Sequence, residues 1–212
     1  NHRSKPIVSV ELPFPISVVY DVVDIYDIVL GSWSTANLSQ ARGIAGGVVV
    51  ADDKAFFAGG ALADGTQSDR VDIYDFVTGA WSTATLSQGR NFIGAGTVGD
   101  KVLFAGGVTD DGTETDRVDV YDLITGTWSI DAISVARGFS DNVATVCEKL
   151  YFVGGVGLDN AEQFNEDFSE IDVYDGSTWT VDQLPYDLYL HSVAGVDNEL
   201  IVNAEEEIFE MN

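Results

Sequence analysis

The 212-residue sequence has little cysteine, little positive charge and no long apolar run. Its single cysteine, Cys147, excludes an internal disulfide framework, and we expect this thiol to be a bystander in a hairpin turn. No apolar stretch approaches the roughly 18 residues that a membrane span needs, so no membrane insertion is expected. Ten lysines and arginines against 35 aspartates and glutamates give a net charge of -25. Nucleic acids and anionic membrane surfaces require a positive footprint, so both are poor partners and no nucleic-acid binding is expected.

Histidine is scarce as well, since the chain holds His2 and His191 alone. One usable histidine cannot build a metal centre that needs several histidine ligands, and the sequence predicts no catalytic residues. Carboxylates are plentiful enough to serve a glycosidase, which leaves an enzyme using loop carboxylates as one alternative. The acidic excess suits solubility in a salty, extracellular or cell-surface setting, the location that we favour. The same charge would suit the binding of divalent cations or of a basic protein partner.

What the sequence has in abundance is an internal repeat. A module made of Val-Asp-Ile-Tyr-Asp, then Thr-Gly-Ala-Trp, then Leu-Ser-Gln-Gly-Arg runs from Val71 to Arg90, and a similar module recurs from Val118 to Arg137. The tryptophans recur at intervals of 48, 47 and 51 residues. Repetition at this spacing indicates stacked supersecondary units. The recurring scaffold residues are Trp33, Trp81, Trp128, Trp179, Tyr74, Tyr121, Tyr174 and the glycine pairs Gly59-Gly60, Gly106-Gly107 and Gly154-Gly155.

Each copy contains short apolar runs bounded by turn signals, which are typical of buried strands. In the copy that spans residues 43–90, we expect one strand over 44–50 and a second from Lys54 to the glycine pair. A third strand is expected over 71–75, and a fourth begins at Trp81. Four strands of about five residues per module suit a four-stranded antiparallel blade. Joined as a meander, these strands place short turns such as 52–53 on one face and the longer connections on the other.

The order of glycine pair, Tyr-Asp and tryptophan resembles the Kelch repeat over roughly residues 22–202. The resemblance implies an all-β fold, a Kelch-type β-propeller with about four blades of four antiparallel strands. We assign an N-terminal segment, 1–21, as a candidate extra strand, and a propeller domain, 22–212. Its modules lie near 22–42, 43–90, 91–137, 138–190 and 191–212.

The ends of the repeat leave two architectures open. Propellers of this family usually carry more blades than this length allows, and the last copy has lost its glycine pair. We favour a closed ring, in which the C-terminal strands, with 207–210 as a third strand, complete the blade that the N-terminal strands begin. The alternative is part of a larger propeller, whose exposed strand edges would favour self-association.

Arginines also recur at equivalent positions of the modules. Arg42, Arg90 and Arg137 precede each first strand, and Arg70 and Arg117 precede each third strand. This recurrence favours interblade ion pairs and bridges to backbone carbonyls. An arginine ring that captures a carboxylate is the functional alternative.

Two predicted long loops, 61–69 and 108–116, are rich in carboxylates. Calcium prefers oxygen ligands of this kind, so a calcium-dependent adhesion or structural module is an alternative function. The run from Asp110 to Glu114 does not match the twelve-residue calcium loop, and Asp-Gly-Thr is ordinary turn chemistry. No other cofactor is expected. The candidate calcium ligands are Asp64, Asp69, Asp110, Asp111, Glu114 and Asp116.

The third long loop, 156–170, and the last long connection, 185–191, depart from the repeat. The first is longer than its two counterparts, and the second has lost the Leu-Ser-Gln-x-Arg pattern. Both should lie on one face of adjoining blades, where their aromatic side chains either pack onto the blade or anchor a partner. We therefore predict a non-catalytic interaction module that binds a protein or glycan through the long-loop face. The predicted partner-binding residues are Phe164, Phe168, Tyr186, Tyr189 and His191.

Overall fold

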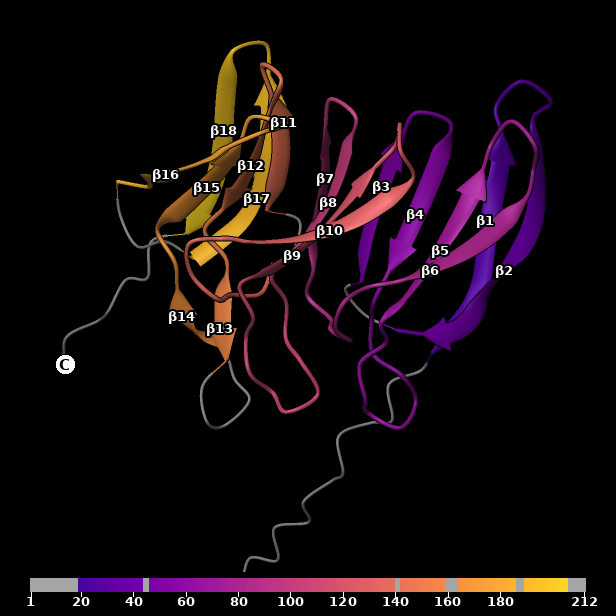
Figure 1. Ribbon diagram of the computed structural model, residues 1–212, viewed down its shortest axis with the longest axis horizontal. Coiled ribbons are helices and arrows are strands. Elements are labelled where there is room, and N and C mark those ends of the chain that lie inside the picture. The colour runs from indigo at the N-terminus through magenta and orange to yellow at the C-terminus, as the bar shows by residue number, and fades with distance from the viewer. Residues whose placement is uncertain (1–18, 44–45, 140–141, 159–163, 186–188, 206–212) are drawn as a thin grey trace, which may run out of the picture.

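A computed structural model of the chain describes residues 19–43, 46–139, 142–158, 164–185 and 189–205. These residues form β-strands joined by turns and loops (Figure 1), and no helix among them is long and apolar enough to cross a membrane. Three four-stranded antiparallel sheets follow one another along the chain, with a two-stranded hairpin at each end of the row. The predicted all-β fold of four-stranded blades is therefore confirmed.

The three complete sheets are named blades I, II and III. Blade I holds β3 (Gly47–Ala51), β4 (Lys54–Ala58), β5 (Arg70–Asp75) and β6 (Trp81–Thr85). Blade II holds β7 (Gly94–Val98), β8 (Lys101–Ala105), β9 (Arg117–Asp122) and β10 (Thr127–Ala132). Blade III holds β11 (Val143–Val146), β12 (Lys149–Val153), β15 (Glu170–Tyr174) and β16 (Trp179–Gln183). The strands predicted within residues 43–90 are present in blade I, although β3 begins at Gly47 rather than at residue 44.

Each end of the row is half a blade. The N-terminal half-blade, β1 (Tyr20–Asp27) and β2 (Ser32–Arg42), carries the Tyr-Asp and Trp signals of third and fourth strands. The C-terminal half-blade, β17 (Tyr189–Val196) and β18 (Glu199–Glu205), follows blade III as first and second strands. Residues 207–210, predicted as a third strand, lie outside the described residues.

Among the described residues, the structure does not show the predicted ring closure. The two half-blades lie at opposite ends of the row, and each of their strands pairs only within its own hairpin among the described residues (Figure 1). Each half-blade packs on the neighbouring complete blade, and the row does not turn far enough to bring β18 beside β1. The described strands thus form an open row of blades.

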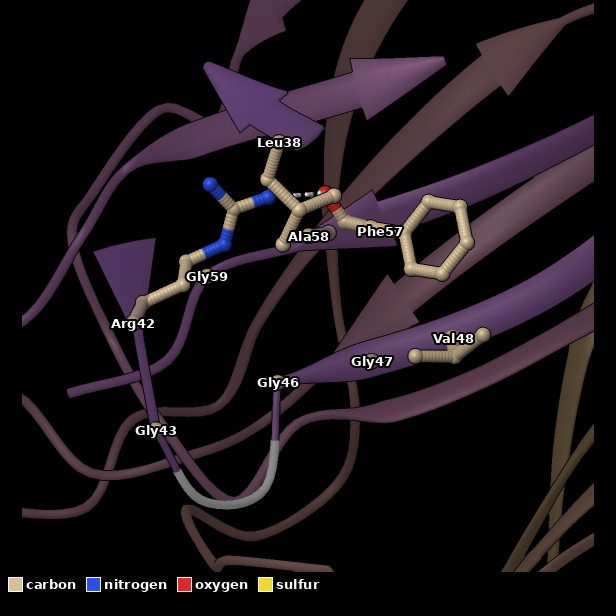
Figure 2. A pocket seen from close by; sticks show the side chains of 9 residues that line it. All are labelled: Leu38, Arg42, Gly43, Gly46, Gly47, Val48, Phe57, Ala58 and Gly59. Atoms are coloured by element: carbon tan, nitrogen blue, oxygen red, sulfur yellow. Dashed lines mark hydrogen bonds between the residues drawn. The ribbon is translucent and has the colours of Figure 1, made fainter. Parts of the chain in front are cut away.

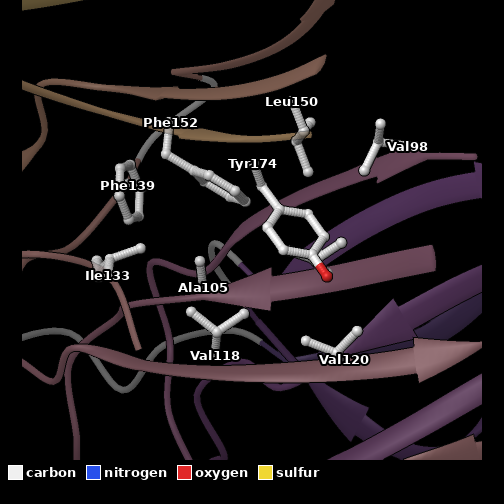
Figure 3. Packing of buried hydrophobic residues seen from close by; sticks show 10 residues of the cluster. Val98, Ala105, Val118, Val120, Ile133, Phe139, Leu150, Phe152 and Tyr174 are labelled. Carbon is white, nitrogen blue, oxygen red and sulfur yellow. The ribbon is translucent and has the colours of Figure 1, made fainter. Parts of the chain in front are cut away.

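The core lies between successive blades and extends along the row. The first strand of each blade packs on the first strand of the next, in the series β3 with β7, β7 with β11, and β11 with β17. Figure 3 shows one such layer, where Leu150, Phe152 and Tyr174 of blade III face Val118 and Val120 of blade II. Burying a phenylalanine side chain contributes about 1.5–3 kcal/mol, so these layers supply much of the stability.

The recurring tryptophans close the outer part of each blade. Trp81 lies with its ring centroid 5.0 Å from that of Tyr74 and 5.8 Å from that of Phe57. Trp128 and Trp179 repeat this contact with Phe104 and Phe152, at 6.0 and 5.9 Å. The tryptophan series is therefore part of the scaffold of the complete blades.

The meander separates two faces, as predicted. The β3–β4, β7–β8, β11–β12 and β17–β18 turns lie together along the upper edge of Figure 1, and the long connections lie along the lower edge. We call these the short-turn face and the long-loop face. The turns from third to fourth strands are held by carboxylates: Asp122 accepts the N–H groups of Ile124 and Thr125 at 3.0 and 2.7 Å.

The Asp122 turn predicts a loss of stability in acid. A hydrogen bond from Lys101, together with the Thr125 N–H, lowers the pKa of Asp122 from 3.8 to about 2. A carboxyl group with a lowered folded-state pKa stabilises the fold above its unfolded pKa, and this contribution disappears as the pH falls through the folded value. We expect the melting temperature, followed by circular dichroism, to fall between about pH 4 and pH 2. The Asp122→Asn variant should show a shallower slope there, and an unchanged slope would contradict this assignment.

Candidate functional site

The recurring arginines clamp each blade to the one before it. Arg90, which precedes β7, is fully buried, and its Nη2 lies 2.7 Å from Oδ2 of Asp119 in β9. The same nitrogen donates to the Phe104 carbonyl at 2.9 Å, and Oδ1 of Asp119 accepts the Ser87 N–H at 2.9 Å. The Leu-Ser-Gln-x-Arg segment that follows blade I therefore binds the Asp119 carboxylate of blade II through a backbone N–H and a guanidinium group.

The same clamp occurs at the neighbouring junctions. Arg42 Nη2 lies 2.7 Å from Oδ2 of Asp72, whose Oδ1 accepts the Ser39 N–H. Arg137 Nη2 lies 2.6 Å from Oδ2 of Asp172. Burial lowers the pKa of Arg90 and Arg137, which their aspartates oppose, and guanidinium groups stay charged in proteins. The geometry corresponds to interblade ion pairs and carbonyl bridges, and each of the three guanidinium groups is already paired with a carboxylate of its own chain.

The glycine pairs complete these junctions. Both glycines of each pair adopt positive φ, 61° at Gly106 and 112° at Gly107. The Gly107 N–H donates to the Arg137 carbonyl at 2.9 Å, and the Gly60 N–H donates to the Arg90 carbonyl at 3.0 Å. Glycine is required because backbone carbonyls lie against both positions: a Cβ atom would lie 2.3 Å from the Arg137 oxygen at Gly106 and 2.5 Å from the Asn91 oxygen at Gly107.

The two acidic loops on the long-loop face are built by the same turn. Asp64 accepts the N–H and hydroxyl of Thr66 at 3.0 and 2.6 Å, which lowers the pKa of Asp64. Asp111 accepts the corresponding groups of Thr113 at 3.2 and 2.7 Å, and the hydroxyl groups of Thr109 and Thr113 lower its pKa. These carboxylates therefore stabilise the loops that carry them.

The loops also contact each other and enclose a small hollow. The carboxylate of Asp110 accepts the N–H of Gln67 from the neighbouring loop. A pocket of about 270 Å³ lies beside this contact, lined by Gln88, Gly89, Thr109, Asp110 and Asp111. The sequence did not predict this pocket, because its lining residues come from two modules and no sequence motif indicates that the two modules are in contact here.

The candidate calcium ligands do not converge on one point. Asp69 and Asp116 precede β5 and β9, where their carbonyls accept the N–H groups of Leu86 and Ile133 at 2.7 and 2.9 Å. Glu114 lies within the second loop, in a β-bridge with Val108. Within the described ranges, no three histidine, cysteine, aspartate or glutamate side chains are arranged to hold a metal ion.

The third long loop differs from the prediction because it contains a further hairpin. β13 (Val156–Leu158) and β14 (Phe164–Asp167) pair antiparallel and extend blade III on the long-loop face (Figure 1). Phe164 begins β14, and Phe168 follows it with a half-buried side chain. The residues between 158 and 164 lie outside the described residues.

Two of the other predicted partner-binding residues lie at the start of β17. Tyr189 and His191 belong to this strand, which begins on the long-loop face and packs on β11 of blade III. Tyr186 lies outside the described residues. The strands that carry Phe164, Tyr189 and His191 thus start from the same face, on blade III and the adjoining half-blade.

A second hollow lies on the short-turn face, where no sequence motif predicts a site. It measures about 670 Å³ and lies between the turns of blades II and III. Two of its carboxylates have partners in the chain: Asp100 lies 3.6 Å from Lys101 Nζ, and Asp175 accepts the N–H groups of Ser177 and Thr178. These hydrogen bonds hold the pKa of Asp175 well below its usual value.

Comparisons with known proteins agree with this architecture. Residues 89–132, which span all four strands of blade II, match the model of the Kelch motif. Among solved structures, the chain is similar to one described as "Structure of YjhT", with 18% sequence identity and a TM-score of 0.62. That match covers 86% of this chain and 68% of the other, and at this identity it bears on the fold alone. No curated protein matches the chain. Blade II therefore carries a Kelch motif, the same glycine pair, Tyr-Asp and tryptophan recur in the flanking blades, and the fold is that of β-propeller blades.

Proposed function

We propose that this chain is a non-catalytic interaction module that binds a protein or glycan partner through its long-loop face. The observation that carries the proposal is the β13–β14 hairpin, which interrupts an otherwise regular repeat on that face. An additional hairpin does not complete the four-stranded sheet of blade III, which β11, β12, β15 and β16 already form. It therefore adds surface where the other blades have loops.

The rest of the face supports a binding role. The two acidic loops are held by their own hydrogen bonds and by the contact of Gln67 with Asp110. Loops that are ordered before binding lose less conformational entropy when a partner docks. Their carboxylates, in a chain of net charge -25, favour a partner with a basic surface.

The test is a double substitution in the two irregular segments. Phe164→Ala with Tyr189→Ala should reduce retention of a bound partner more than tenfold, because truncation of an aromatic anchor typically costs about 2 kcal/mol or more. The immobilised chain is exposed to an extract of its source and to a glycan array, with bound protein measured by quantitative mass spectrometry. Repeating the capture with a chelator tests the calcium-dependent alternative.

The matched control removes an aliphatic side chain from the opposite face. Ile124 is 80% exposed in the turn between β9 and β10, so Ile124→Ala should leave retention unchanged. Circular dichroism must show that both variants fold. If the folded double variant keeps full binding, or if Ile124→Ala loses it equally, the long-loop face is not the recognition surface.

A further inference from the structure

The N-terminal end of the row has an uncovered apolar face. In β3, Gly47 and Val49 face blade II, whereas Val48 and Val50 point the other way and are 61% and 58% exposed. The N-terminal half-blade covers only the outer part of this side, because β1 and β2 occupy the third and fourth strand positions. Strands in the first and second positions are absent there among the described residues.

A pocket marks the same uncovered place. It measures about 200 Å³ and lies between β2 and the start of blade I. Figure 2 shows Leu38 and Arg42 on one side of it and Val48 and Phe57 on the other. At the next junction along the chain, the equivalent side of blade II is covered, because β3 packs on β7.

The C-terminal end of the row presents the complementary face. In the C-terminal half-blade, Val193, Leu200 and Val202 pack on the core of blade III. Val196 and Ile201 alternate with these residues and point away from blade III, and they are 51% and 50% exposed. The edge of β18 that would pair with a third strand has no partner in the described part of the chain.

We propose that the C-terminal half-blade of one copy docks onto the N-terminal half-blade of a second copy. Placing β18 beside the free edge of β1 completes a four-stranded blade from two chains. It also continues the interface that the row already repeats three times, with β17 packing on β3 of the second copy as β11 packs on β17. Val196 and Ile201 then cover Val48 and Val50. The contact is head-to-tail, so it can extend through further copies or close into a ring.

The charges at this junction set its strength. In blades I and II a lysine of the second strand lies opposite an aspartate of the third, Lys54 opposite Asp75 and Lys101 opposite Asp122. The same register places Glu199 of one copy opposite Asp27 of the second copy, so two negative charges are adjacent. The clamp is also incomplete, since Pro185 has no N–H at the position equivalent to Ser87. The contact should therefore be weaker than an interblade contact and should strengthen as salt screens the carboxylates.

The register gives a direct test by disulfide cross-linking. Phe56 pairs with Ile73 in blade I, and the equivalent residues of the junction are Ile201 and Ile25. In a Cys147→Ser background, Ile25→Cys and Ile201→Cys should each stay largely monomeric alone and form a disulfide-linked dimer when mixed. Non-reducing electrophoresis and peptide mass spectrometry read the product. Val29→Cys, at a position 89% exposed in the β1–β2 turn, replaces Ile25→Cys as the out-of-register control.

Light scattering of the unmodified chain provides an independent measurement. The mean mass should rise with protein concentration and with salt between about 50 and 500 mM. Glu199→Lys should shift the association to at least tenfold lower concentration, and Val50→Asp should abolish it. A constant monomer mass with no cross-link in the mixture would overturn the proposal. So would an intramolecular disulfide in the Ile25→Cys, Ile201→Cys double variant, since it would show closure within one copy.

Discussion

Arg90→Ala is expected to lower the free energy of unfolding by about 3–5 kcal/mol. The substitution removes the guanidinium that lies 2.7 Å from Asp119 and leaves that carboxylate buried without its counter-charge. It also removes the hydrogen bond to the Phe104 carbonyl. For a chain of this size the melting temperature should fall by roughly 6–20 °C. Chemical denaturation followed by tryptophan fluorescence measures the change.

Two further variants show whether the buried charge is the cause. Arg90→Ala with Asp119→Ala removes both charges and should recover part of the loss, because no unpaired carboxylate remains. Arg70 recurs like Arg90 but is half-buried at the start of β5 and takes part in none of the three clamps. Arg70→Ala should cost less than about 1 kcal/mol. Equal losses in the two single variants would refute a special role for the clamp.

Gly106→Ala is expected to destabilise the fold by about 2–5 kcal/mol. Positive φ costs a non-glycine residue about 1–2 kcal/mol, and overpacking adds about 1–3 kcal/mol. Here a Cβ atom would lie 2.3 Å from the Arg137 carbonyl oxygen and 2.7 Å from the ring of Phe139. Those atoms belong to the next junction, so the variant should loosen the contact between blades II and III. Urea denaturation measures the loss.

Gly112 separates the two contributions. Its φ is +77°, and a Cβ built there meets no atom within 4 Å. Gly112→Ala should therefore show the backbone cost alone, about 1–2 kcal/mol. If Gly112→Ala is as damaging as Gly106→Ala, the close approach of the blades does not explain the glycine pair.

The repeat made the blade predictable from the sequence. Tyr74, Trp81 and the glycine pair recur because each contacts the same neighbours in every module, and strand length follows from the spacing between them. The interblade placement of Arg90 follows from the same logic, since a buried guanidinium at a repeated position needs a repeated carboxylate. Its partner, Asp119, was visible in the Val-Asp-Val-Tyr-Asp motif, but the motif alone does not show which side chain the arginine meets.

Other features could not be read from the pattern. Ring closure depends on the angle that accumulates between successive blades, and that angle is not encoded in residue spacing. The 156–170 segment was predicted as a loop because it has no period, yet Val156 and Phe164 begin paired strands. Carboxylates such as Asp64 and Asp111 have the composition of a cation site, but their hydrogen bonds to threonines give them the geometry of turns.

The arginine–aspartate clamps all point in the same direction along the row of blades. Each serine and arginine reaches forward to an aspartate of the following module, so every module depends on its neighbour as units do in a one-dimensional chain with nearest-neighbour coupling. Blade II is coupled on both sides, whereas no clamp precedes β1 and β2 in the described part of the chain, where Asp24 is exposed. We therefore expect unfolding to begin at the two ends of the row and to reach blade II last, with cooperativity that grows with each module added.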